Sequence, residues 1–382
     1  MQREPQIEIL PYSKRKSFFI GLCVVFAILL PTMIFYTTGY RVDLDDSENR
    51  IVTTGGLYIT TDNLEVDVYM NDEQVQRPRL FRSAYYIQDV QSGMHRVIVQ
   101  QDGLHTWVKE LPVDPYMVVE AAAFNMPLQP QLRHVSEFSI DTDTVVVPAS
   151  ASTSPFFTVA TTTGKIVFAT TSATSSFERS GEYDFVQTLF STSTASSTSL
   201  IDRFLSEVER FGFATTTNNT ASTSDLLVPT KGNITLIERD SDLYAEWTGS
   251  DSSIPYYFCV TNTATTTISS RYGEHVAEQI QTQSLSTTTP LYVDSNRICR
   301  TEIKIDRKRQ DVLFYEFLPG ASDLILMQLE DGLYVSEIDD RAWQNTQQIF
   351  PGSDFTIKIE NDTIYIKQGN QYAELLREIP QL

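Results

Sequence analysis

A long uncharged segment near the N-terminus constrains this chain more than any other feature. From Ser17 to Tyr40 there is no Asp, Glu, Lys or Arg, and most residues are large and apolar. At about 1.5 Å per residue, a helix of this length crosses a hydrocarbon core of about 30 Å. Pro31 lies inside the segment, a position that membrane helices tolerate. The sequence therefore predicts a transmembrane helix over residues 17–40.

The flanking charges indicate the orientation of this helix. Basic residues precede it at positions 14–16, whereas acidic residues dominate the stretch that follows it. Because Lys and Arg are enriched on the cytoplasmic side, we expect a cytoplasmic tail over residues 1–16. The bulk of this single-pass cell-membrane protein is then extracytoplasmic. A cleaved signal peptide is the alternative, but it needs a shorter apolar core and a small-residue cleavage site, for which Thr37 to Gly39 is a weak match.

Charge and composition narrow the class of function. The chain has 29 Lys and Arg against 49 Asp and Glu, a net charge of -20. It lacks the basic face that binding of nucleic acid phosphates requires, so we expect no nucleic-acid partner. Only four His and three Cys are present, and no nucleotide-binding loop or hydrolase motif is found. We therefore predict no enzyme, and no catalytic, cofactor-binding or metal-binding residues.

One acidic stretch partly matches a calcium loop. Oxygen-bearing side chains alternate from Asp43 to Asn49, as in the first half of such a loop. The glycine that the loop needs is missing, and Thr54 stands where a Glu should close it. We interpret the stretch as a solvated turn beside the membrane.

Two cysteines in the exported part are candidates for a disulfide. Cys259 and Cys299 both lie beside apolar, strand-like residues, in a compartment where oxidation is permitted. A bridge would close a loop of about 40 residues and stabilise the fold by about 4 kcal/mol in the chain-entropy model. Two buried free thiols are the alternative. Cys23 lies in the membrane segment and is interpreted as an apolar filler.

Residues 51–115 alternate between apolar and polar side chains and are punctuated by turn residues such as Asn71-Asp72 and Asp102-Gly103. Short strands at this spacing predict a small antiparallel β-sandwich. Trp107 is expected in its core, and His95 is interpreted as a structural side chain on a strand.

Part of this region resembles the PEGA domain. The matching residues of its second half are Gly93, His95, Val97, Val99, Gly103 and Trp107, and those of its first half lie in 55–59 and 68–71. Residues 63–66 depart from the tetrapeptide that names the family. With its anchor and β-rich C-terminal part, the chain is similar to single-pass envelope proteins of small-genome bacteria. The resemblance implies a sandwich used for adhesion or scaffolding, without catalysis.

The rest of the chain, 116–382, is expected to form one β-rich domain. Residues 141–230 are rich in Ser and Thr and read as surface insertions. Within them 155–170 is typical of a strand pair and 199–211 of an amphipathic helix. Further on, a turn residue followed by an apolar-Tyr strand recurs at 241–247, 331–335 and 362–366. Such repeats predict a β-propeller-like or stacked-sheet domain.

These observations leave more than one function open. The leading hypothesis is a non-enzymatic surface protein whose β-domains bind or scaffold cell-wall or surface-layer glycan or an envelope protein. The alternative is an anchored polysaccharide hydrolase that uses paired carboxylates across a cleft. A sensor is a third hypothesis, and its short cytoplasmic tail would require a partner in the membrane.

Overall fold

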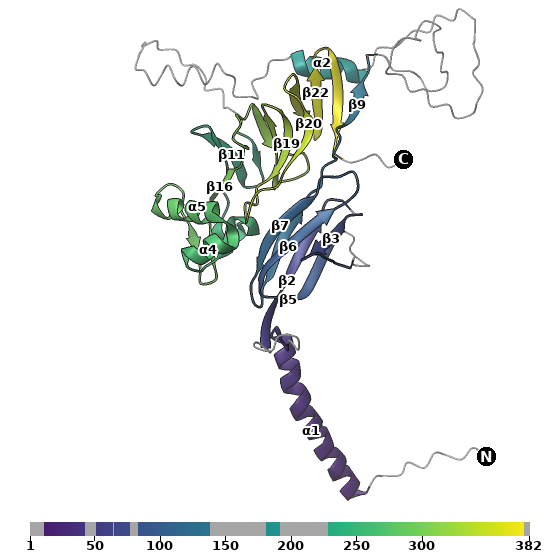
Figure 1. The fold of residues 1–382 in the computed structure, drawn as a ribbon, viewed down its shortest axis with the longest axis vertical. Coiled ribbons are helices and arrows are strands. Elements are labelled where there is room, and N and C mark those ends of the chain that lie inside the picture. The colour runs from purple at the N-terminus through teal and green to yellow at the C-terminus, as the bar shows by residue number, and fades with distance from the viewer. Residues whose placement is uncertain are drawn as a thin grey trace, which may run out of the picture. The chain divides into compact units, whose positions relative to one another are not determined.

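The structure, a computed structural model, describes residues 11–42, 51–63, 65–76, 83–137, 181–191 and 228–377. These residues are mainly β, with one long N-terminal helix followed by several β-sheets (Figure 1). The chain divides into two compact units, residues 1–129 with 227–350 and residues 130–226 with 351–382. This division differs from the single domain predicted over 116–382, because the chain enters unit 2 twice and returns to unit 1 between the two passages.

Helix α1, Tyr12–Thr37, begins after Pro11 and contains Pro31 without interruption. It has no buried residue, and it is long and apolar enough to cross a membrane by length and composition. The helix starts a few residues before the predicted segment and ends before Gly39, whose positive φ of 81° turns the chain into the first strand.

A β-sandwich follows, as predicted. One sheet has the order β1-β2-β5 with β8 beside β2, and the other has the order β4-β3-β6-β7. The strands are β1 Tyr40–Val42, β2 Ile51–Thr61, β3 Asp67–Met70, β4 Glu73–Gln74, β5 Ala84–Gln91, β6 Gly93–Gln100, β7 Trp107–Val113 and β8 Val118–Ala123. The inward positions of both sheets are fully buried, among them Leu57, Ile59, Val97, Val99 and Trp107.

Two details of the sandwich differ from the prediction. Strand β8 pairs parallel to β2, whereas an all-antiparallel sandwich was expected. The sandwich also extends beyond 51–115, since both β1 and β8 pair with β2. The chain can join β2 and β8 in parallel because the intervening strands return it to the same end of the sheet.

Several hairpins turn on paired residues with positive φ. These pairs are Asn71-Asp72, Asp240-Ser241 and Asn361-Asp362. Two consecutive left-handed residues match the twist of the flanking strands, and Asn and Asp adopt this conformation at low cost.

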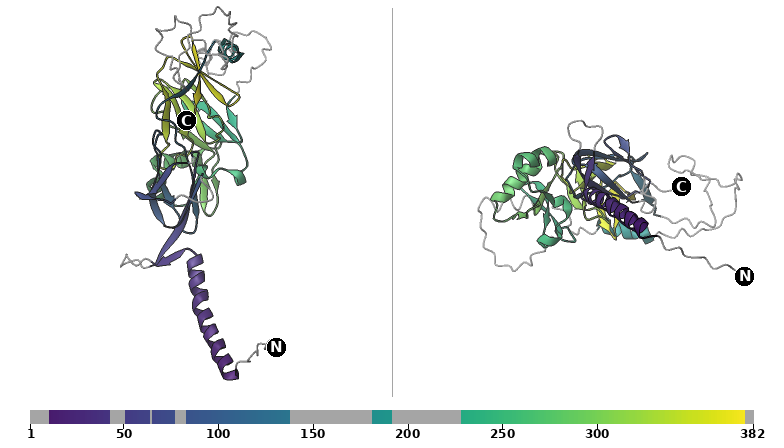
Figure 2. Two further views of the ribbon diagram at one scale, coloured as in Figure 1. Left: turned by 90° about the vertical axis from the view of Figure 1, so that its right-hand side faces the viewer. Right: turned by 90° about the horizontal axis from the view of Figure 1, so that it is seen from below.

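Unit 1 continues with two four-stranded antiparallel sheets (Figure 2). The first contains β10 Thr230–Lys231, β11 Ile234–Arg239, β12 Asp242–Trp247 and β16 Glu302–Ile305, and the second contains β17 Phe314–Phe317, β18 Leu324–Leu329, β19 Gly332–Glu337 and β20 Thr346–Pro351. The predicted hairpins at 241–247 and 331–335 are confirmed as β12 and β19. Both sheets contribute to one apolar core that includes Leu236, Leu243, Ile303, Ile325 and Met327.

A segment inserted between β12 and β16 carries the disulfide. It contains η1 Asp251–Ser253, η2 Tyr256–Phe258, β13 Cys259–Thr261, α4 Thr265–Tyr272, α5 Glu274–Leu285, β14 Tyr292–Val293 and β15 Arg297–Cys299. Cys259 and Cys299 face each other across β13 and β15 and are bonded, which confirms the predicted pair. The two helices were not predicted, and their buried residues form a separate small core with Val260.

Unit 2 contains one further four-stranded sheet and helix α2, Gly181–Ser191. The sheet consists of β21 Thr356–Glu360, β22 Thr363–Gln368, β23 Gln371–Leu376 and β9 Gln131–Val135. Strand β9 comes from far earlier in the chain and completes the sheet beside β23. Val186 of α2 is fully buried and shares a core with Val135, Tyr365 and Tyr372.

Some predicted features lie outside the described residues. They are the strand pair at 155–170, the helix at 199–211 and the whole calcium-like stretch from Asp43 to Asn49. The described residues form separate sheets without a closed ring, so a propeller stays a prediction.

Candidate functional site

Lys109 is a charged residue in an inward position of the sandwich. It lies on β7 between Trp107 and Leu111, and all three side chains are 0% exposed. Since alternate residues of a strand share a face, Lys109 must point to the same side as its two apolar neighbours. Strand β7 lies at the edge of its sheet, where the ammonium group reaches residues of the C-terminal part of unit 1.

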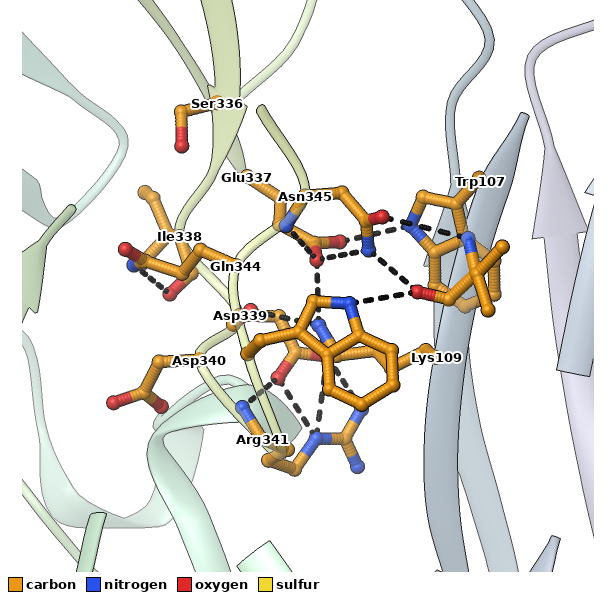
Figure 3. A network of polar contacts seen from close by, with 12 residues as sticks. Trp107, Lys109, Ser336, Glu337, Ile338, Asp339, Asp340, Arg341, Gln344 and Asn345 are labelled. Atoms are coloured by element: carbon orange, nitrogen blue, oxygen red, sulfur yellow. Dashed lines mark hydrogen bonds and ion pairs between the residues drawn. The ribbon is translucent and has the colours of Figure 1, made fainter. Parts of the chain in front are cut away.

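Lys109 forms ion pairs with two carboxylates at the end of β19 and just after it (Figure 3). Its Nζ lies 2.7 Å from Glu337 Oε1 and 3.4 Å from Asp339 Oδ2, and it donates to the Asp339 carbonyl at 2.7 Å. The Trp107 indole donates to Glu337 Oε2 at 3.0 Å. Both β7 side chains therefore end on the same short acidic segment.

Arg341 balances the second carboxylate. Its Nε lies 2.9 Å from Asp339 Oδ1 and its Nη2 lies 2.7 Å from Asp339 Oδ2, a two-point contact. The same Nη2 donates to the Glu120 carbonyl of β8 at 2.7 Å. Two cations thus face two anions, so the group formed by Lys109, Glu337, Asp339 and Arg341, here called the charged network, is formally neutral.

A second buried ion pair lies next to the charged network. Arg300 and Asp340 have side chains with 0% exposure and are joined by contacts of 2.6 and 2.7 Å. Gln279 of α5 donates to Asp340 Oδ2 at 3.2 Å, and His275 lies 2.8 Å from the Asp340 carbonyl through its Nε2. This pair ties the disulfide-containing insertion to the segment after β19.

The same segment covers the open edge of β7. The side-chain amide of Asn345 accepts a hydrogen bond from the Val108 backbone N–H at 3.4 Å and donates one to its carbonyl at 3.1 Å. Trp343 Nε1 also donates to that carbonyl, at 2.9 Å. An edge strand exposes unpaired backbone groups, and these side chains satisfy those of Val108 in place of a further strand.

Burial and neighbouring charges shift the pKa values of Glu337 and Asp339 in opposite directions. Burial raises the pKa of Glu337 above its ordinary value, although Lys109 acts against this. Burial also works to raise the pKa of Asp339, but the charges of Arg341 and Lys109 outweigh it and hold that pKa below its ordinary value. Asp339 is therefore the anion that the surroundings stabilise most, since it meets both cations.

The geometry of the charged network suits a structural connection. Each ionised group has its charge balanced and its hydrogen bonds made within the fold, so none is left to act as a free base or nucleophile. Within the described ranges, no group of three or more His, Cys, Asp or Glu could hold a metal ion.

The residues singled out in the sequence lie apart from the charged network, with one exception. His95 contacts Asn71 Nδ2 at 2.8 Å and the Gln91 carbonyl at 2.6 Å, as a structural side chain would. Trp107 is in the core, as predicted, and it also belongs to this site. Sequence reasoning missed Lys109, although a lysine in the inward register of a strand is a signal for a buried partner.

Comparisons with known proteins give little information on the family or the function of this chain. No protein-family model matches it, and no curated protein matches it significantly. Among solved structures it has a weak similarity to a protein from Bacteroides fragilis described as membrane-associated and of unknown function. The two share 10% identity, the match covers 85% of this chain and 94% of the other, and the TM-score is 0.16.

Proposed function

We propose that this chain is a membrane-anchored, non-enzymatic protein of the cell surface. Its β-domains would bind or scaffold a cell-wall or surface-layer glycan or an envelope protein. The observation that carries the proposal is the apolar helix α1, which has no buried residue and is separated from the sandwich by Thr38 and Gly39 alone. A helix with this composition and no buried residue along its length requires an apolar environment.

The orientation follows from the flanks of α1. Lys14, Arg15 and Lys16 lie in its first turns, on the side that carries the short N-terminal segment. The positive-inside rule then keeps the N-terminus in the cytoplasm and the sandwich outside. Oxidation of Cys259 and Cys299 agrees with an extracytoplasmic location.

The described residues of unit 1 support a scaffold more than a catalyst. Their most deeply buried charges are paired with one another and hold separate segments together. The PEGA-like character of the sandwich is part of this proposal, as is a propeller-like arrangement of the four-stranded sheets. Both the sandwich and the four-stranded sheets would then act as rigid supports that present a binding surface to the partner.

The anchor is tested first, with the full chain expressed in a bacterial host. We expect the protein to stay in the membrane fraction after alkaline carbonate extraction, and external protease to degrade all but the N-terminal part. A matched variant, Phe26→Lys with Leu29→Lys, places two charges in α1 and should leave the membrane fraction. Retention of this variant would count against a transmembrane α1.

Binding is tested on vesicles carrying the full chain, mixed with native cell-wall fragments. Sedimentation of the vesicles with the wall material, without release of reducing sugar, supports a glycan-binding scaffold. Sugar release above that of vesicles without protein would replace the proposal with the hydrolase. Absence of both would restrict the proposed partner to an envelope protein, which chemical crosslinking in cells would detect.

A further inference from the structure

Exposed apolar side chains gather where α1 meets the sandwich. They come from the loop between β7 and β8, where Tyr116 is 55% and Met117 46% exposed, and from Val118 at the start of β8, which is 46% exposed. Tyr40 of β1 is also exposed, at 37%. These four residues are here called the basal patch.

The basal patch continues the aromatic end of α1. The ring of Phe35, in the last turns of the helix, stacks on Tyr40 at a centroid distance of 5.3 Å. Tyr40 in turn meets the edge of Tyr116 at 5.6 Å. Aromatic side chains thus lead without a break from the helix to the β7–β8 loop.

Backbone contacts hold the loop in this position. Tyr116 N–H donates to the Thr54 carbonyl at 2.9 Å, and Thr54 N–H donates to the Gly39 carbonyl at 2.9 Å. Thr54 Oγ1 donates to the same Gly39 carbonyl, also at 2.9 Å. The loop is therefore linked through Thr54 to Gly39, the second residue after α1.

Tyr116 also adopts an unfavourable backbone conformation. Its φ is 64°, a left-handed value that costs a bulky residue about 1 kcal/mol or more. Strained residues of this kind concentrate at functional positions. The strain at Tyr116 accompanies a large ring that packs beside Tyr40 but stays 55% exposed, so the fold itself buries less than half of the residue.

Within the part of the chain that the structure describes, two acidic groups near the basal patch form ion pairs. Asp89 forms an ion pair with Arg41, and Asp114 forms one with Arg271 at 2.6 Å. Arg41 also donates to the Tyr36 carbonyl at 2.6 Å and lies 3.6 Å from the centre of the Tyr36 ring. These two carboxylates therefore do not oppose the approach of the patch to a lipid surface.

We propose that the basal patch inserts into the interface between lipid headgroups and acyl chains, beside the point where α1 leaves the membrane. The membrane is the surface that the patch can reach, because only Thr38 and Gly39 separate α1 from β1. Two residues span at most about 7 Å and keep the patch close to the end of the helix. Tyr and other residues with an apolar body and a polar tip are favoured at this depth. The contact would make the sandwich rest on the membrane and limit its tilt. This inference rests on the proposed membrane anchoring.

The test uses spin labels on the full chain in phosphatidylcholine vesicles. A label on the native Cys23 reports on α1, and a label on Met117→Cys in a Cys23→Ser background reports on the basal patch. Leu313→Cys in the same background is the control, since Leu313 is 48% exposed and belongs to the same unit. Power saturation compares access to oxygen, which concentrates in hydrocarbon, with access to a water-soluble nickel chelate.

We expect the Cys23 label to favour oxygen strongly, the Met117 label to shift in the same direction, and the Leu313 label to remain fully aqueous. Tyr116→Ser should move the Met117 label back towards water while the Cys23 label stays unchanged. An aqueous Met117 label together with a hydrocarbon Cys23 label would overturn the inference and leave the anchor intact. An aqueous Cys23 label would overturn the anchor itself. Spin–spin broadening at Met117 that disappears on dilution with unlabelled protein would assign the patch to a second copy of the chain, and it would also overturn the inference.

Discussion

Lys109 and Arg300 are held in unit 1 with no solvent exposure, each against carboxylates that are almost as deeply buried. Removal of such charges from water costs several kcal/mol per ion, and a direct partner offsets this cost only when the geometry is good. The two-point contacts of Arg300 with Asp340 and of Arg341 with Asp339 meet this condition. These residues are therefore more sensitive to single substitutions than the surface ion pairs are.

Lys109→Met tests this sensitivity. The substitution keeps an apolar stem but leaves Glu337 buried without its cation, so we expect the free energy of unfolding to fall by about 3–5 kcal/mol. The measurement is urea denaturation of the full chain in detergent. Lys304→Met is the matched control, because its ion pair with Asp242 lies at the surface, with side chains that are 46% and 21% exposed, and contributes at most about 1 kcal/mol. Equal losses in both variants would contradict a special role for Lys109.

Asp339→Asn tests the dependence of stability on pH. The pKa of Asp339 lies below its ordinary value of 3.8, so its ionised form stabilises the fold above that pH and the contribution is lost as the pH falls further. Glu337 has a raised pKa and acts with the opposite sign. We expect the stability difference between wild type and variant to be constant near neutral pH and to shrink below about pH 4. A difference that grows in acid would reverse the assignment.

Two elements of unit 1 depend on connections outside the regular sheet hydrogen bonds. The edge of β7 is covered by the Asn345 and Trp343 side chains. The insertion between β12 and β16 has only short strands of its own, and it is held by the disulfide and by Arg300. A segment with so few ladder hydrogen bonds is expected to open locally before the sheets do.

The double variant Cys259→Ser with Cys299→Ser tests the role of the disulfide. Its residues are 40 apart in sequence, and loss of a cross-link over such a loop removes about 4 kcal/mol in the chain-entropy model. Hydrogen exchange followed by mass spectrometry should show faster exchange over 248–301, with smaller changes in β18 and β19. Cys23→Ser is the control and should leave exchange in unit 1 unchanged. Identical protection in the double variant would show that packing alone holds the insertion.

At the scale of the whole molecule, charge governs which partners can approach. The net charge is -20 and the isoelectric point is about 4.6. An acidic chain gains nothing from the release of counterions on which binding to nucleic acid depends. Long-range repulsion also keeps such molecules apart at neutral pH.

A direct test is a gel-shift assay with labelled duplex DNA and RNA. We expect no retardation by the full chain in detergent at about 0.15 M salt, where a basic DNA-binding protein retards the same probe. Retardation that weakens as salt is raised would reveal a basic surface that the overall charge conceals.

Features set by local pattern could be read from the sequence. The length and composition of 17–40 predict an apolar spanning helix, and α1 agrees apart from a shift at both ends. Alternation predicts the sandwich strands and the hairpins before Tyr244, Tyr334 and Tyr365, because a period of two requires one face to be buried. The pairing of Cys259 with Cys299 could be predicted because they are the only two cysteines outside the apolar segment 17–40.

The tertiary structure alone decided which distant residues meet. The parallel pairing of β8 with β2 and the return of β9 to β23 depend on contacts between segments far apart in the chain. The charged network also depends on contacts between distant residues. The inward position of Lys109 indicates that a buried anion must lie beside it, but the sequence does not identify which residue supplies that anion. Its partners, Glu337 and Asp339, lie more than two hundred residues away, among many acidic residues that look alike in the sequence. Periodicity determines which face of an element is buried, whereas the identity of its neighbour is set only when the whole core has closed.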